Sequence, residues 1–173
     1  NRIAVVTWNN ALRSTLSFSN AKTTILNFIN AMAARYSTNS TTGLTKAKEY
    51  AQSFQANTLH AVVLLTDGEN NGGGSGHSQA IDDSSLAICQ ELKNMNPATI
   101  IYTIALGNAM QKDGSGNFIK PEGLAIDQFL RKCASGASAE NDNIYYFIAP
   151  SAAQLNTVFT TIANNLQKLR ITD

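Results

Sequence analysis

The stretch that decides the fold is Ala61-Val62-Val63-Leu64-Leu65-Thr66-Asp67-Gly68-Glu69, in which an apolar run ends abruptly at an aspartate and a glycine. A run that is apolar on both faces is typical of a central strand in a parallel sheet, because helices cover such a sheet on both sides. Ligands of open α/β sheets bind beyond the carboxyl ends of these strands. The sequence therefore predicts a buried strand over His60–Thr66 that places the Asp67 carboxylate at a functional sheet edge.

A second polar loop, Thr38-Asn39-Ser40-Thr41-Thr42-Gly43-Leu44, stands immediately before a helical pattern. Its hydroxyl groups could face Asp67, and hard oxygen ligands of this kind suit Mg²⁺ or Ca²⁺. The alternative role for Thr38 is helix capping, since Ser, Thr and Asn residues before helices usually act as caps. Both roles can coexist if Thr41 or Thr42 caps the helix while Thr38 faces the ion.

Strand-like and helical patterns alternate along the chain, which predicts an α/β fold with a doubly wound, mostly parallel sheet. A hairpin of Ile3–Trp8 and Leu12–Phe18 opens the chain and supplies one antiparallel edge strand. Ser19 or Asn20 is expected to cap the first helix, and Ser151 opens a capping box before the last. Two further strands are predicted, over Thr99–Leu106 and Ile144–Ile148. Five segments with apolar residues at helical spacing predict five helices. Their apolar residues are Ile25, Ile29, Met32 and Tyr36 in the first; Leu44, Ala47, Ala51 and Phe54 in the second; Leu86, Cys89 and Leu92 in the third; Ile126, Phe129, Leu130 and Cys133 in the fourth; and Leu155, Val158, Phe159, Ile162, Leu166 and Leu169 in the last.

Three other polar segments invite functional interpretations that their details do not support. The loop at Gly72–Gly76 lacks the Gly-Lys-Ser/Thr ending of a nucleotide-binding loop, so a surface loop is favoured. The segment Asp113–Asn117 begins like a calcium loop, but Leu124 stands where a glutamate is required, which favours a turn. Asp82-Asp83-Ser84-Ser85 opens a helical pattern, and we interpret it as capping.

Composition excludes several classes of partner. The 173 residues fit a single domain over 1–173, and only 14% of them are charged. A net charge of +1 without a basic run gives no footprint for nucleic acid or an anionic membrane. The sequence contains no stretch of about 18 apolar residues, so direct insertion of this chain into a membrane is not expected.

The loop Thr38-x-Ser40-x-x-Gly43-Leu44, the strand end Leu65-Thr66-Asp67-Gly68-Glu69 and the alternation of strands and helices resemble a von Willebrand factor A domain. The two loops match the second and third motifs of the metal-ion-dependent adhesion site of that family. Each motif is weak alone, but the ordered set is more specific. The resemblance implies that Thr38 and Asp67 bind Mg²⁺ or another divalent cation, with Ser40 and Gly68 in the same loops.

Later segments, including Ile101–Ala105 and Cys133-Ala-Ser, resemble the TadG-like proteins of bacterial tight-adherence pili. This resemblance covers Cys89 as well as Cys133. Two buried thiols would be ordinary in a cytosolic protein, but an exported compartment would oxidise them. The resemblance therefore implies a disulfide between Cys89 and Cys133.

One motif of the resembled family is missing from this sequence. In the family, Asp-x-Ser-x-Ser follows the first strand and lies upstream of the segment that resembles Asn1 to Phe18. The expected fold is therefore a von Willebrand A-like domain that lacks its N-terminal strand. The remaining cation ligands would come from the upstream motif, so a bound cation is expected only where that motif is present.

The resemblance implies a non-enzymatic, extracytoplasmic adhesion or pilus-assembly module. A protein partner would present an acidic group to the cation, and any membrane anchor would lie in an N-terminal segment outside this chain. One alternative is a structural interaction module with a non-functional metal site. A less favoured alternative is a hydrolase that uses the same strand-end face.

Overall fold

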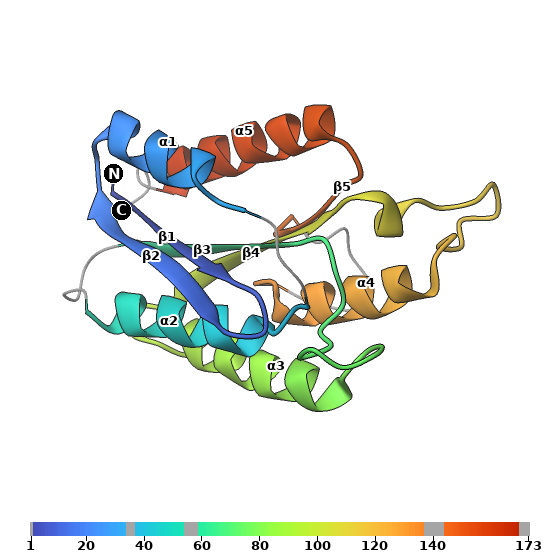
Figure 1. The fold of residues 1–173 in the computed structure, drawn as a ribbon. Helices are drawn as coiled ribbons and strands as arrows, with labels where there is room; N and C mark the ends of the chain where they lie inside the picture. The colour runs from blue at the N-terminus through green and yellow to red at the C-terminus, as the bar shows by residue number, and fades with distance from the viewer. Residues whose placement is uncertain (1, 34–36, 54–58, 137–143, 170–173) are drawn as a thin grey trace.

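The computed structural model describes residues 2–33, 37–53, 59–136 and 144–169. A layer of strands lies between two layers of helices (Figure 1). In order, the elements are β1 (Ile3–Trp8), β2 (Leu12–Ser19), α1 (Lys22–Asn30), α2 (Ser40–Gln52), β3 (His60–Thr66), α3 (Gln79–Lys93), β4 (Thr99–Leu106), the 3₁₀ turn η1 (Asn108–Met110), α4 (Pro121–Cys133), β5 (Tyr146–Ala149) and α5 (Ala152–Leu169). Helices α1 and α5 lie on one face of the strands, and α2, α3 and α4 lie on the other (Figure 1).

The strands form two sheets, one parallel and one antiparallel. Strands β3, β4 and β5 are parallel in that order, whereas β1 and β2 form an antiparallel pair. The expected α/β class is confirmed, but the antiparallel strand belongs to a separate two-stranded sheet. Within the described residues, no hydrogen-bonded pairing joins β1 to β3.

Strand β4 supplies the core on both faces of the parallel sheet. Ile101 packs into the cluster beneath α2, α3 and α4, while Tyr102 and Ile104 pack into the cluster beneath α5. All three side chains are fully buried. Alternation of side chains across a strand places successive residues on opposite faces, so one apolar strand stabilises both helical layers.

The outer helices bury less apolar surface than their patterns predicted. In α5, Val158 and Ile162 lie on one side of the helix and are buried. Phe159 directly follows Val158, so its side chain points away from that side, and it is 45% exposed. In α1 no residue is buried, and Ile29 and the following Met32 remain exposed; the main contacts of this helix are with β2 of the small sheet. Tyr36 and Phe54 lie outside the described residues.

Helix starts differ from the expected caps. Asn39 caps α2 by accepting a hydrogen bond from the Thr41 backbone N–H at 3.2 Å, so neither Thr41 nor Thr42 is the cap. Ala21 precedes α1 without a side-chain cap, in place of Ser19 or Asn20. Asparagine ranks with the best capping residues, which explains its selection over the neighbouring threonines.

The last strand and helix largely follow the expected pattern. Strand β5 occupies Tyr146–Ala149, two residues later at its start than expected. At the start of α5, the Gln154 backbone N–H donates to the Ser151 hydroxyl at 3.3 Å, and that hydroxyl donates to the Gln154 side chain at 2.7 Å. This is half of a capping box, because the glutamine side chain returns to the hydroxyl instead of the Ser151 backbone.

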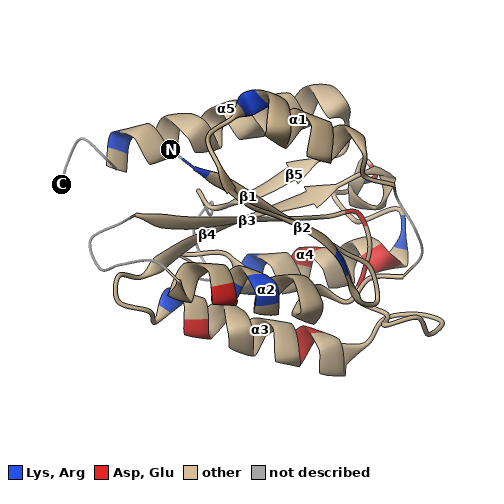
Figure 2. Cartoon of the chain, turned by 60° about the vertical axis from the view of Figure 1, so that its left-hand side comes forward, with Lys and Arg blue, Asp and Glu red and all other residues tan. Residues whose placement is uncertain are grey.

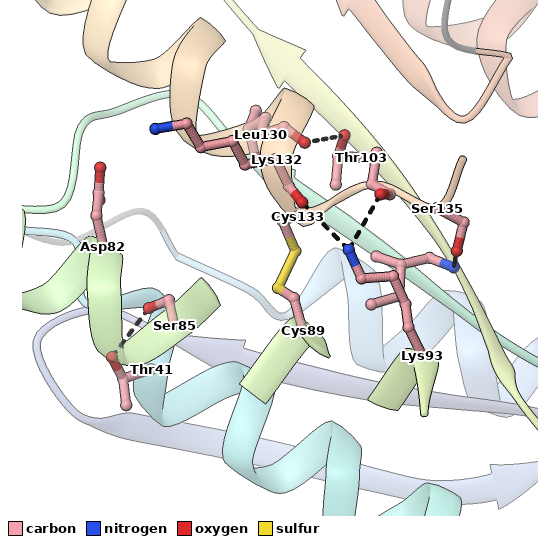
Figure 3. The surroundings of a disulfide bond; sticks show 12 residues. Thr41, Asp82, Ser85, Cys89, Lys93, Thr103, Leu130, Lys132, Cys133 and Ser135 are labelled. Carbon is pink, nitrogen blue, oxygen red and sulfur yellow. Dashed lines mark hydrogen bonds between the residues drawn. A yellow bond between two sulfur atoms is a disulfide. The ribbon is translucent and has the colours of Figure 1, made fainter. Parts of the chain in front are cut away.

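A disulfide between Cys89 and Cys133 joins α3 to the end of α4 (Figure 3). Both cysteines are fully buried. The Lys93 ammonium donates to the carbonyl oxygen of Lys132 at 3.2 Å and to that of Ala134 at 3.4 Å, so the same two helix ends are also tied by hydrogen bonds. The resemblance implied this disulfide, and the structure contains it.

Helix α4 is further fixed to the sheet through Asp127. The Tyr146 hydroxyl donates to Asp127 Oδ1 at 2.7 Å, and Arg131 Nε donates to Asp127 Oδ2 at 2.9 Å. Burial, reinforced by the hydrogen bond to Asp127, raises the pKa of the Tyr146 hydroxyl. The neutral phenol therefore remains the donor through the physiological range, and α4 keeps one orientation on β5.

We predict that removal of the disulfide in Cys89→Ala/Cys133→Ala lowers the free energy of unfolding by about 4 kcal/mol, because the bond closes a 44-residue separation in the unfolded chain. Chemical unfolding in guanidinium measures the change. The same preparations report the pairing directly, since the oxidised wild-type protein should take up no alkylating reagent without reductant. Two alkylated thiols under those conditions would disprove the disulfide.

We also predict that Gly43→Ala destabilises the protein by about 1–3 kcal/mol, the usual cost of overpacking. A Cβ at position 43 would lie 2.6 Å from Trp8 Cε3, and the indole ring cannot move aside as a flexible chain end could. Gly114→Ala is the matched control, because a Cβ there meets nothing within 4 Å. Urea unfolding that shows equal stability for the two variants would contradict the close packing of α2 on β1.

Candidate functional site

The end of β3 forms a tight turn that presents Asp67. The buried Thr66 hydroxyl donates to the Gly68 carbonyl oxygen at 3.0 Å, and the Gly68 backbone N–H approaches the same hydroxyl at 3.4 Å. Asp67 between them is exposed. The side chain that starts the turn therefore holds the following carboxylate at the sheet edge, where the apolar run predicted it.

Strand β4 ends beside Asp67 because of the parallel register. Thr66 is opposite Ala105, so the residues that follow the two strands lie side by side. A Cβ at Gly107 would be 3.8 Å from the Asp67 Cβ. Gly107 has a φ of +88°, a conformation that glycine adopts readily and other residues rarely do. The chain can thus turn away from β4 without covering Asp67.

Backbone hydrogen bonds hold the Thr38 loop against the segment after β3. The backbone N–H groups of Asn71 and Gly72 donate to the Thr38 carbonyl oxygen at 2.9 and 3.1 Å. In return, the Thr38 N–H donates to Asn71 Oδ1 at 3.1 Å. A Cβ at Gly68 would be 3.2 Å from the Thr38 hydroxyl oxygen, so this hydroxyl lies beside the residue that follows Asp67.

These segments surround an open cavity of about 430 Å³, which we call the strand-end cavity. Thr38, Asp67 and Gly68 all line it. Three carboxylates and one ammonium group line it, which gives it an acidic character. The lining residues come from the ends of β3 and β4, the loop before α2 and the start of α4: Ser37, Thr38, Asp67, Gly68, Glu69, Asn71, Gly107, Asn108, Ala109, Lys120 and Glu122.

Elsewhere the charged residues are sparse: α1 and α5 carry only basic residues, whereas α2, α3 and α4 carry both signs (Figure 2). This distribution agrees with the low charge content of the sequence and its net charge of +1. The acidic lining of the strand-end cavity therefore stands out against a nearly neutral surface.

Asn70 is a buried residue that sequence reasoning missed; it does not line the strand-end cavity, but it holds the loop that contains Thr38 and Ser40. It is only 2% exposed. Its Oδ1 accepts a hydrogen bond from the Ser40 backbone N–H at 2.8 Å, and its Nδ2 donates to Asp82 Oδ1 at 2.8 Å. Nothing in the pattern of a polar loop distinguishes Asn70 from its half-buried neighbours Glu69 and Asn71, so only the folded structure identifies it.

Asp82 differs from the capping role expected for it. The residue before α3 is Ser78, whereas Asp82 is buried one turn further on. Besides its bond to Asn70, Asp82 pairs through Oδ2 with His77 Nε2 at 3.0 Å. A buried carboxylate needs such partners, so Asp82 anchors α3 to the loop after β3 and its histidine.

The oxygen ligands of the strand-end cavity suit a hard divalent cation in kind. Thr38 and Asp67 supply a hydroxyl and a carboxylate of the type that Mg²⁺ and Ca²⁺ prefer. Ser40 Oγ is completely buried and has no hydrogen-bond partner in the described part of the chain, and Ser40 does not line the strand-end cavity. Across the same residues, no three His, Cys, Asp or Glu side chains gather as a metal cluster.

The other polar segments behave as local structure. Asp113 Oδ1 accepts hydrogen bonds from the backbone N–H groups of Asn117 at 3.0 Å and Ser115 at 2.9 Å, and these bonds lower the pKa of its carboxyl group. The segment is therefore a turn, as expected. Gly72 and Gly76 both have positive φ in an exposed loop. No described helix has both the length and the apolar character needed to cross a membrane.

Comparison with known proteins identifies the family. The sequence profile of the von Willebrand factor type A domain matches residues 1–161. The chain belongs to this family. A search of curated proteins finds no significant match.

Solved structures share the fold at low sequence identity. The von Willebrand domain of the type V pili tip protein Mfa5 from Porphyromonas gingivalis has a TM-score of 0.69 at 13% identity, with 96% of this chain and 79% of that chain covered. The pilus adhesin SpaC from Lactobacillus rhamnosus GG, in an open conformation, has a TM-score of 0.62 at 12% identity, with 94% and 25% covered. The von Willebrand A-like chain thus spans about a quarter of SpaC and most of the Mfa5 domain.

We predict that Asn70→Ala lowers the free energy of unfolding by about 1–3 kcal/mol, because it leaves the buried Ser40 N–H and Asp82 carboxylate without their shared partner. Gln79→Ala is the control, since among the described residues its amide donates to the exposed Asp83 at 2.8 Å. Hydrogen exchange should show faster exchange of the Ser40 amide in Asn70→Ala alone. Unchanged protection of that amide would refute the role assigned to Asn70.

Proposed function

We propose that this von Willebrand A domain is an extracytoplasmic adhesion or pilus-assembly module that binds a protein partner through a divalent cation at the strand-end cavity. The observation that carries the proposal is the meeting of the Thr38 and Asp67 loops in one acidic cavity at the carboxyl ends of parallel strands. Ligands of open α/β sheets occupy this position.

Thr38 and Asp67 are the residues proposed to hold the cation, with Ser40 and Gly68 positioned in the same two loops. Mg²⁺ requires a nearly octahedral set of oxygen ligands, so two side chains are insufficient. The family motif Asp-x-Ser-x-Ser, upstream of the segment that begins here, would supply the others. When bound, the cation offers an open coordination position to a carboxylate of the partner.

Three further observations support an extracytoplasmic, non-enzymatic role. The buried Cys89–Cys133 disulfide is typical of proteins in oxidising compartments. The two solved structures that share the fold belong to proteins described as a pilus tip protein and a pilus adhesin. His77 pairs with Asp82 at 3.0 Å, so the partner of this histidine is Asp82 and not Asp67.

We predict that Mn²⁺, as a paramagnetic substitute for Mg²⁺, broadens the amide signals of Thr38, Gly68 and Gly107 in the NMR spectrum of the full-length protein. Asp67→Ala should abolish the effect because it removes the carboxylate ligand. Asp83→Ala, which deletes an exposed aspartate of α3, is the matched control and should leave the broadening unchanged.

Two outcomes would contradict the cation site. One is the absence of localised broadening in the full-length protein, and the other is broadening that Asp67→Ala does not alter. Either result would favour a structural interaction module with a non-functional metal site. Turnover of a substrate that depends on Asp67 would instead support a hydrolase.

A further inference from the structure

The loop from β3 to α3 contains Asn71-Gly72, the single Asn-Gly pair in the sequence. Asparagine before glycine is especially prone to spontaneous deamidation, because glycine has no side chain to keep its backbone nitrogen away from the preceding carboxamide. The loop projects past the start of α3 (Figure 1), and residues 72–74 are exposed to water. Asn71 itself lines the strand-end cavity. A chemically reactive pair therefore stands at the wall of the candidate site.

Four hydrogen bonds hold this pair in place, and we call them the Thr38 clasp. The backbone N–H groups of Asn71 and Gly72 donate to the Thr38 carbonyl oxygen at 2.9 and 3.1 Å. Asn71 Oδ1 accepts from the backbone N–H groups of Thr38 at 3.1 Å and Gly73 at 3.3 Å. The clasp thus engages both groups that deamidation must join, the Gly72 nitrogen and the Asn71 carboxamide.

Deamidation requires the clasp to open. The Gly72 nitrogen must leave the Thr38 oxygen, and the Asn71 carboxamide must turn away from its two N–H donors. The nitrogen then attacks Asn71 Cγ and closes a succinimide ring, while the Cγ–Nδ2 bond breaks and ammonia leaves with the proton of the Gly72 amide. Water hydrolyses the ring. Opening at Cγ gives aspartate at position 71, and opening at the main-chain carbonyl carbon gives isoaspartate.

We propose that Asn71 is a site of spontaneous deamidation whose rate is governed by opening of the Thr38 clasp. The modification changes the charge of the strand-end cavity, because it adds a fourth carboxylate to those of Asp67, Glu69 and Glu122. The effect of this charge on a bound cation rests on the proposed function, whereas the reaction itself does not.

The two products affect the clasp differently. Asn71 enters the clasp with its side chain only as an acceptor, and Nδ2 has no partner in the described part of the chain. An aspartate carboxylate can accept the same two N–H groups, so this product keeps the Thr38 loop in place. Isoaspartate adds a methylene to the main chain, so the N–H group of position 71 and that of Gly72 no longer reach the Thr38 oxygen together. This product releases the loop.

The test follows position 71 by peptide mass spectrometry while the full-length protein is incubated at mildly alkaline pH. Liquid chromatography separates the aspartate and isoaspartate products. Two references lack the clasp: the urea-unfolded protein and the peptide acetyl-Glu-Asn-Asn-Gly-Gly-Gly-amide, which has the sequence of residues 69–74. We expect conversion in the folded protein to be at least about tenfold slower than in both references, because the clasp must open first. No detectable conversion at position 71, or a rate equal to that of the peptide, would overturn the proposal.

Asn70→Ala tests the control of the rate by the clasp. It removes the bond from the Ser40 N–H to Asn70 Oδ1, which holds the loop that carries Thr38. We expect conversion of Asn71 to be several-fold faster in the folded variant than in the folded wild type, with equal rates after unfolding. Gln79→Ala, which changes an exposed side chain of α3, is the matched control and should convert at the wild-type rate.

Hydrogen exchange keeps the test decisive if Asn70→Ala does not fold. The Gly72 amide exchanges only when its bond to the Thr38 oxygen opens. In the wild-type protein this amide should therefore be protected, and urea below the unfolding transition should raise its exchange and the conversion of Asn71 in parallel. A Gly72 amide that exchanges as fast as in the peptide would contradict the clasp.

Mg²⁺ separates this inference from the proposed function. A cation held by Thr38 and Asp67 stabilises the closed clasp, so saturating Mg²⁺ should slow the conversion of Asn71 in the full-length protein. Asn71→Asp should bind Mg²⁺ several-fold more tightly than the wild type. Asn164→Asp, which adds the same charge on the exposed side of α5, should not.

The two proposals can then fail independently. If Asn71 converts through the clasp but Mg²⁺ changes neither its rate nor the affinity of Asn71→Asp, the cation site fails and the modification site stands. If position 71 does not convert while Mn²⁺ produces broadening that depends on Asp67, the modification site fails and the cation site stands.

Discussion

The structure depends on the burial of β4 on both faces. A strand with no exposed side requires hydrogen-bonding neighbours at both edges and apolar cover above and below. Strands β3 and β5 provide the edges in parallel, and α5 with α3 and α4 provide the cover. Parallel neighbours end at the same edge of the sheet, so the location of the strand-end cavity follows directly from the burial of one strand.

The elements that sequence predicted correctly are those whose pattern has a single physical explanation. The apolar run that ends at Asp67 correctly predicts a parallel strand and its end, and Gly107 marks the end of its neighbour. The run was expected to be a central strand, however, and β3 is an edge strand of the described sheet with Val63 39% exposed. Where a pattern is compatible with several degrees of burial, the sequence predicted the element but not how deeply it is buried. The sequence of α1 has a helical apolar stripe, but the stripe cannot show how much sheet is available to cover it, and Ile29 remains 43% exposed.

Polar residues within the site were less predictable for a related reason. Thr38 and Asp67 belong to motifs whose order carries information, whereas Asn70 and Asp82 acquire their roles through contacts between segments far apart in the chain. Asp82 at the start of a helix resembles a cap in any local description. Its burial is a property of the packed loop after β3, so the bond to Asn70 appears only when the chain is folded.

Within the described residues, β3 pairs with β4 along one edge and with no strand along the other. Strand β3 contains no Lys, Arg, Asp or Glu, and its Val63 is 39% exposed. Natural sheets usually protect such an edge with charge, proline or a bulge, because an unprotected edge is a template for another strand. With only 14% charged residues, long-range repulsion between copies is weak. The backbone groups along this edge of β3 are therefore able to pair with a further strand, and the charges around them do little to oppose it.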